Sequence, residues 1–174
     1  MEKFIREIKE EEFDQVYKIM ESSFPSVERR TYENELREFN SSSFKVFVVE
    51  EKGAVAGFIK EWDLPSFNFI EHFATDPMVR GKGLGSRMLR EYLKGRKKPV
   101  IIEVEWNSSQ IAKRRINFYE RLGFTLSDIE YIQPKLQDVK DEVLLKLMYY
   151  PGDVDESILI ESKKEIFEKV YKVK

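Results

Sequence analysis

The stretch FNFIEHFATDPMVRGKGLGSRMLREYLK, residues Phe67 to Lys94, decides the fold that this sequence predicts. It opens with apolar residues at alternate positions, which is typical of a strand over Phe67–Ala74. Asp76-Pro77 ends the strand, and the glycine-rich basic loop Arg80–Gly85 leads into a segment whose apolar residues recur at helical spacing. The sequence therefore predicts a strand, a glycine loop and an amphipathic helix in direct succession.

A glycine loop between a strand and a helix is well suited to bind an anion. The first backbone N–H groups of a helix have no partner within the helix, and the helix dipole favours negative charge there. The basic side chains of the loop add positive charge at the same place. We expect a diphosphate to bind the loop and the helix start, at Arg80, Gly81, Lys82, Gly83, Leu84, Gly85 and Ser86.

The loop matches neither of the two common nucleotide-binding patterns, because it lacks Gly-x-x-x-x-Gly-Lys-Ser/Thr and has Met88 where Gly-x-Gly-x-x-Gly requires its third glycine. The pattern Arg80-x-x-Gly83-x-Gly85 resembles the pyrophosphate loop of the GNAT acyltransferase superfamily, which reads Gln/Arg-x-x-Gly-x-Gly/Ala. The resemblance implies acetyl-CoA (coenzyme A) as the cofactor. The alternative is a glycine-rich helix start whose basic side chains are only solvated.

A second segment strengthens the resemblance. Phe118–Phe124, FYERLGF, is similar to the GNAT signature whose tyrosine reaches the sulfur of CoA. Tyr119 would therefore be the catalytic acid that protonates the leaving thiolate, or alternatively an aromatic residue of the core. Many members place an Asn seven residues before this tyrosine, where this sequence has Ala112, so Asn107 is expected to make that cofactor contact instead.

The strand before the loop holds the other expected site residues. Glu71 shares a strand face with Phe69 and Phe73 in regular alternation, and desolvation between two phenyl rings would raise its pKa toward that of a catalytic base. The alternative is that Glu71 only binds the acceptor or pairs with Arg114 or Arg115.

His72 is expected on the opposite face from Glu71, as a core histidine rather than a catalytic one. The resemblance further implies that this strand splays from the next parallel strand. Backbone N–H groups at Phe73, Ala74 and Thr75 would then be free for the pantetheine arm and the thioester carbonyl.

The composition excludes several classes of function. The 174 residues include 30 Lys and Arg, 32 Asp and Glu, one His and no Cys. Disulfides, a cysteine nucleophile and multi-histidine metal sites are excluded, and we expect no metal. The near-zero net charge and the absence of a long apolar run favour a cytoplasmic protein that binds neither nucleic acid nor membrane. Only the basic clusters 94–98 and 113–115 support a modifier of ribosomal proteins.

The periodicity along the chain, with the resemblance, predicts an α/β (α+β) fold. We expect a mixed, mostly antiparallel sheet of six to seven strands, flanked by helices, with a splayed parallel pair at Phe67–Ala74 and Val100–Glu105. Residues 1–150 would form the GNAT-like domain, and 151–174 a helical extension packed on it.

The expected function is N-acetyl transfer from acetyl-CoA to a primary amine of a small molecule or protein, by direct attack in a ternary complex. The expected assembly is a monomer or homodimer. The alternative function is a module that binds or senses acyl-CoA without catalysis.

Overall fold

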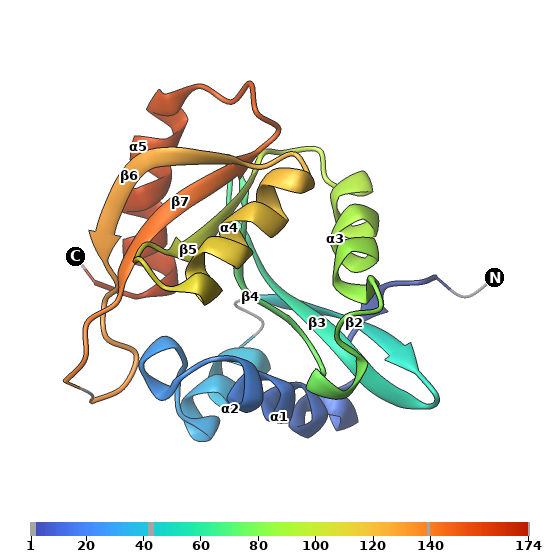
Figure 1. Ribbon diagram of the computed structural model, residues 1–174. Coiled ribbons are helices and arrows are strands. Elements are labelled where there is room, and N and C mark those ends of the chain that lie inside the picture. The colour runs from blue at the N-terminus through green and yellow to red at the C-terminus, as the bar shows by residue number, and fades with distance from the viewer. Residues whose placement is uncertain (1–2, 42–43, 139, 174) are drawn as a thin grey trace.

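A seven-stranded sheet with the order β1-β2-β3-β4-β5-β7-β6 forms the centre of the computed structural model, which describes residues 3–41, 44–138 and 140–173 (Figure 1). All neighbouring strands are antiparallel except β4 and β5. The strands are β1 (Arg6–Glu7), β2 (Lys45–Glu51), β3 (Ala54–Asp63), β4 (Asn68–Thr75), β5 (Val100–Glu105), β6 (Thr125–Ile132) and β7 (Leu144–Tyr150). The structure confirms the mixed, mostly antiparallel sheet.

Helices cover both faces of the sheet (Figure 1). On one side, the α1 face, lie α1 (Phe13–Ser23), α2 (Tyr32–Asn40) and α5 (Glu156–Glu165), which continues as a π-helical turn over Ile166–Val170. On the other side, the α3 face, lie α3 (Leu84–Lys94) and α4 (Gln110–Arg121). Each face has its own apolar core, and no described helix is long and apolar enough to cross a membrane.

Local sequence signals explain where the helices begin and end. The hydroxyl of Thr31 accepts a hydrogen bond from the Asn34 N–H at 3.2 Å and caps α2. Ser109 caps α4 in the same way through the N–H of Ala112. Gly123 follows α4 with a φ of +100°, a left-handed conformation that ends a helix and that glycine adopts without strain.

The parallel strands β4 and β5 pair only at their beginnings. Asn68, Phe69 and Ile70 lie opposite Val100, Ile101 and Ile102, respectively. Beyond these pairs β4 stays with β3 and β5 stays with β7, so the two strands separate toward their C-terminal ends. This is the splayed parallel pair that the resemblance to the GNAT family implies, and it opens the middle of the sheet.

A β-bulge at Glu71 changes the faces that regular alternation predicts for β4. His72 lies opposite Lys60, but Ile70 lies opposite Glu61, so Glu71 is the extra residue. As a consequence Phe69 is buried in the core of the α1 face, whereas Phe73 packs against the core of the α3 face. The predicted placement of Glu71 between Phe69 and Phe73 on one face is therefore wrong.

Candidate active site

A groove of about 710 Å³ lies where β4 and β5 have separated, between the start of α3 and helix α4. It contains the residues predicted to bind the cofactor, with the exception of Lys82 and Asn107. The groove is lined by residues from the end of β4 (Phe73, Ala74, Thr75) and from the glycine loop and helix start (Arg80, Gly81, Gly83, Leu84, Gly85, Ser86). The structure therefore brings these residues together on one surface, and their binding of the cofactor stays a prediction.

The glycine loop presents backbone N–H groups to the groove. Gly81 and Gly83 have φ values of +85° and +78°, which a residue with a side chain rarely adopts. The first hydrogen bond within α3 runs from the Arg87 N–H to the Gly83 carbonyl, so the N–H groups of 84–86 have no partner inside the helix. This arrangement fits the diphosphate of coenzyme A.

Arg80 is fixed at the rim of the groove. Its Nε donates to the carbonyl of Thr75 at 3.1 Å, and its Nη2 donates to the hydroxyl of Ser23 at 2.7 Å. The guanidinium thus joins the ends of β4 and α1 while remaining on the lining of the groove. A charge held in this position can pair with a phosphate without first being ordered.

The end of β4 offers two further donors. The Asp76 N–H bonds to the carbonyl of Ala56 on β3, so the alternating pattern turns the N–H groups of Phe73 and Thr75 away from β3. That side of β4 has no strand partner after Ile70, because β5 has separated from it. Both N–H groups therefore face the opening between the strands.

Asn107 does not line the groove, so the structure does not bring it together with the other residues predicted to bind the cofactor. Its Nδ2 donates to Oε2 of Glu105 at 3.2 Å, and its Oδ1 accepts from the Ser109 N–H at 2.8 Å. These bonds hold Asn107 in the turn between β5 and α4. Lys82 is exposed and does not line the groove either.

Tyr119 lies where the groove meets a second cavity. Only 8% of the residue is exposed, and its ring packs against the rings of Phe73, Phe118 and Phe124. Its hydroxyl makes no hydrogen bond to any residue that the structure describes. Burial raises the pKa of Tyr119, and the nearby charge of Arg115 opposes this effect only in part, so the hydroxyl keeps its proton.

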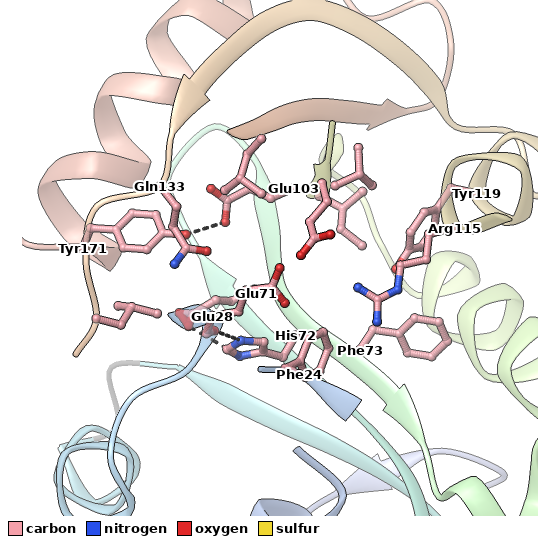
Figure 2. Close-up of a pocket in the computed structure, with 15 residues that line it drawn as sticks. Phe24, Glu28, Glu71, His72, Phe73, Glu103, Arg115, Tyr119, Gln133 and Tyr171 are labelled. Carbon is pink, nitrogen blue, oxygen red and sulfur yellow. Dashed lines mark hydrogen bonds and ion pairs between the residues drawn. The ribbon is translucent and has the colours of Figure 1, made fainter. Parts of the chain in front are cut away.

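The second cavity opens on the α1 face and shares four lining residues with the groove, namely Phe24, Phe73, Arg115 and Tyr119 (Figure 2). Its lining includes four carboxyl groups, those of Glu28, Glu71, Glu103 and Glu105. Glu28 comes from the connection between α1 and α2. The groove and this acidic cavity meet at the splay of the two parallel strands.

Glu71 also lines the acidic cavity, but its carboxylate is fully engaged. It accepts hydrogen bonds from Arg30 at 2.5 Å, Lys60 at 3.1 Å and the indole N–H of Trp62 at 2.8 Å. Burial by itself would raise the pKa of Glu71, but the charges of Arg30 and Lys60 outweigh it and hold the pKa well below its usual range. The raised pKa predicted for Glu71 is wrong, and its ion pairs are with Arg30 and Lys60 instead of Arg114 or Arg115.

His72 lies on the same side of β4 as Glu71, contrary to the prediction from alternation. Its Nε2 is 2.8 Å from the carbonyl oxygen of Glu28, so Nε2 carries the proton and donates. Its Nδ1 is buried, lies 3.6 Å from Oε2 of Glu71 and has no hydrogen-bond partner among the described residues. Burial lowers the pKa of His72, which keeps the ring neutral.

Two carboxyl groups of the cavity have raised pKa values. Burial and the neighbouring carboxylate of Glu105 raise the pKa of Glu28 to about 9. Burial raises the pKa of Glu103 to about 7, although the hydroxyls of Tyr131 and Tyr171 donate to its two oxygens and partly stabilise the charge. Raised carboxyl pKa values in a cavity are typical of acid–base sites and of sites for cations.

Most basic side chains of the cluster 94–98 are paired with carboxylates, whereas Lys113 and Arg114 of the cluster 113–115 are exposed. Arg96 pairs with Glu61 at 2.5 Å, Lys98 with Asp63, and Lys94 with Glu91. The described residues also contain no group of three acidic or histidine side chains placed to hold a metal ion.

The comparisons with known proteins agree with this geometry. The family described as "Acetyltransferase (GNAT) domain" matches residues 42–126. A solved structure of a putative acetyltransferase from the GNAT family of Bacteroides thetaiotaomicron is 34% identical, covers 98% of this chain and 99% of its own, and superposes with a TM-score of 0.86. The chain belongs to the GNAT acetyltransferase family.

This GNAT chain is also similar to two other acetyltransferases. The L-2,4-diaminobutyric acid acetyltransferase of Vibrio parahaemolyticus serotype O3:K6 is 35% identical over 91 residues, which are 51% of this chain and 50% of that protein. The match thus spans about half the length of this curated relative. The ribosomal-protein-S18-alanine N-acetyltransferase of Escherichia coli is 19% identical, with 87% and 94% coverage and a TM-score of 0.64, which shows the shared fold alone.

Proposed function

We propose that this GNAT protein transfers an acetyl group from acetyl-CoA to a primary amine by direct attack in a ternary complex. The observation that carries the proposal is the meeting of two sites at Tyr119, a groove with a diphosphate cradle and an acidic cavity on the other face of the sheet. Acetyl-CoA, when bound, supplies the thioester. The curated relative that acts on diaminobutyric acid supports an amine as the acceptor.

The groove residues would bind and orient the cofactor. The N–H groups of 84–86 and the guanidinium of Arg80 would hold its diphosphate. The N–H groups of Phe73 and Thr75, which face the splay, would donate to the pantetheine arm and to the oxygen that gains charge when the amine attacks. These donors are fixed by pairing with β3 and by the Arg80 contacts, so they need no reorganisation during the reaction.

The acceptor arrives as an ammonium ion and must lose a proton before its nitrogen can attack. Glu28 and Glu105 are the carboxyl groups best placed to accept this proton, because they line the cavity together with Tyr119. A pKa of about 9 at Glu28 is close to that of an alkylammonium, about 10.4, so the ionised form of Glu28, whose fraction grows as the pH rises toward 9, can take the proton at small cost in free energy. We therefore propose Glu28 as the base and give Glu71 the role of holding Arg30 and Lys60.

Tyr119 would act at the other end of the reaction. As the carbon–nitrogen bond forms and the carbon–sulfur bond breaks, the sulfur needs a proton. Tyr119 holds one, because burial keeps its hydroxyl protonated and no described residue accepts a hydrogen bond from it. The second proton lost by the nitrogen returns the phenolate to its neutral form, and the reaction releases one proton overall.

The alternative of a module that only senses acyl-CoA would need the groove but not the acidic cavity. The decisive experiment incubates the protein with acetyl-CoA and a panel of primary amines, and follows free thiol and the mass of each amine. We expect thiol release that depends on an amine, with a product 42 mass units heavier than the amine, as one acetyl replacing hydrogen requires. Binding of acetyl-CoA without turnover of any amine would instead support the sensor.

A further inference from the structure

The C-terminal segment closes the end of the acidic cavity that lies farthest from Tyr119 (Figure 2). The hydroxyl of Tyr171 donates to Oε1 of Glu103 at 2.7 Å. The carbonyl of Val170 accepts a hydrogen bond from Nη2 of Arg30 at 2.8 Å, which ties this segment to the buried ion pairs under the cavity. Glu103 is thus the carboxylate at the closed end of the cavity.

The charges that line the cavity are not balanced. The negative charge of Glu71 is matched by Arg30 and Lys60, but no described lysine or arginine forms an ion pair with Glu28, Glu103 or Glu105. Arg115 is the cationic side chain on the lining, and it lies at the opposite end from Glu103, beside Tyr119 (Figure 2). The closed end therefore has a buried carboxylate that forms no ion pair with a described lysine or arginine, and the charge of Arg30, which is paired with Glu71, acts on it only weakly.

One buried polar atom and one hydroxyl without a partner point to a ligand that can form hydrogen bonds. Nδ1 of His72 is an acceptor without a hydrogen bond, and His72 is only 4% exposed on the cavity lining. The hydroxyl of Tyr119, on the same lining, also lacks a partner among the described residues. Buried polar groups are normally satisfied, so the bare Nδ1 of His72 indicates that a polar molecule completes the cavity.

The distance between the two carboxylates on β5 limits the length of the acceptor that can bind both ends of the cavity. Glu103 and Glu105 are two residues apart on one strand, so they project from the same face about 7 Å from each other. We propose that the acceptor is an amine with a second positive group, which binds Glu103 while the reacting nitrogen lies beside Tyr119. This inference rests on the proposed function and names the class of its acceptor, a diamine.

The test compares two acceptors of equal chain length, 1,4-diaminobutane and n-butylamine, at pH 8, where Glu103 is charged. We expect the wild-type protein to acetylate the diamine with a kcat/KM at least tenfold higher than that of the monoamine. Glu103→Gln, which keeps the shape and removes the charge, should bring this ratio close to one. Glu130→Gln removes an exposed carboxylate from β6 and should leave the ratio as in the wild type.

The outcomes separate this inference from the proposed function. Equal kcat/KM for the two amines in the wild type would overturn the inference, and so would an unchanged ratio in Glu103→Gln. The comparison of the two amines in the wild type needs no variant. For Glu103→Gln, a melting temperature that still rises with acetyl-CoA would show that the variant is folded. Turnover of other amines but not of 1,4-diaminobutane would also overturn the inference, whereas absence of turnover with every amine would refute the proposed function itself.

Discussion

Oε2 of Glu71 lies 2.5 Å from Nη1 of Arg30, and both side chains are almost completely buried. Lys60, which has no exposed surface, donates to the same oxygen at 3.1 Å and to Glu35 at 2.6 Å. Two buried cations thus depend on two buried carboxylates from different parts of the chain. Such a group contributes to stability only while every member is paired, because an unpaired charge in the interior is strongly unfavourable.

Glu71→Gln should therefore lower stability before it affects chemistry. The amide cannot balance Arg30 and Lys60, so we expect the free energy of unfolding to fall by about 3–5 kcal/mol. Urea denaturation at pH 7.5 measures the change. Glu50→Gln is the control, because Glu50 pairs with Arg6 at the surface and should contribute less than about 1 kcal/mol. Equal, small losses in both variants would contradict the role of Glu71 as a partner of buried cations.

A change in the glycine loop should abolish cofactor binding. Gly83→Asp places a carboxylate in open space beside the proposed diphosphate site, since no atom lies within 4 Å of a Cβ at this position. We expect the rise in melting temperature on adding acetyl-CoA to disappear. Gly53→Asp is a matched control, because Gly53 has nearly the same φ, +79°, and equally open surroundings but lies in the β2–β3 turn.

Both aspartate variants carry the same backbone strain and the same charge, so their melting temperatures without ligand should fall by similar amounts. The Gly53 variant should keep the full shift with acetyl-CoA. A full shift in the Gly83 variant would place the diphosphate elsewhere.

The order of the elements and the glycine loop could be predicted because their signals are local. Helical spacing and the glycines after β4 depend on neighbouring residues, and the strand, glycine loop and helix predicted from them appear in the structure. The splayed parallel strands followed from the resemblance to the family. The side-chain directions within β4 could not be predicted from regular alternation. The extra residue at Glu71 exchanges the two sheet faces for the residues after it, and nothing in the sequence marks the bulge.

The acidic cavity was harder to predict because its residues come together only through the fold. Arg30 is 41 residues from Glu71, and Tyr171 is 68 residues from Glu103. Lys60 directly follows the apolar run Ala54–Ile59 of β3, and a lysine in this place was the one available sign of a buried ion pair. Glu28 carried no such signal, since an acidic residue in a loop is usually solvated.

Loss of the Tyr119 hydroxyl should slow turnover without weakening the fold. Tyr119→Phe keeps the ring among its aromatic neighbours, so we expect kcat to fall roughly ten- to a thousandfold while the affinity for acetyl-CoA is retained. Tyr149→Phe is the control, because Tyr149 is also 8% exposed and its hydroxyl likewise makes no hydrogen bond to a described residue, but it lies outside the site. Full activity of the Tyr119 variant would mean that another group protonates the sulfur.

The raised pKa of Glu103 also has a consequence for stability. The folded protein holds this proton up to about pH 7, whereas the unfolded chain releases it near pH 4.5. Between these values the folded state binds more protons than the unfolded state, so the contribution of Glu103 to stability declines as pH rises. The full difference corresponds to about 3 kcal/mol of free energy of unfolding.

Glu103→Gln should remove this decline, because an amide does not ionise and can still accept from Tyr131 or Tyr171. At pH 5 the variant and the wild type should have similar free energies of unfolding, and by pH 8.5 the variant should be more stable by about 3 kcal/mol. Urea denaturation at half-unit intervals of pH measures the difference. The exposed control Glu130→Gln should differ from the wild type by a constant amount. If the difference in free energy of unfolding between Glu103→Gln and the wild type were also constant with pH, Glu103 would ionise as readily as an exposed carboxyl. The raised pKa of Glu103 would then be contradicted.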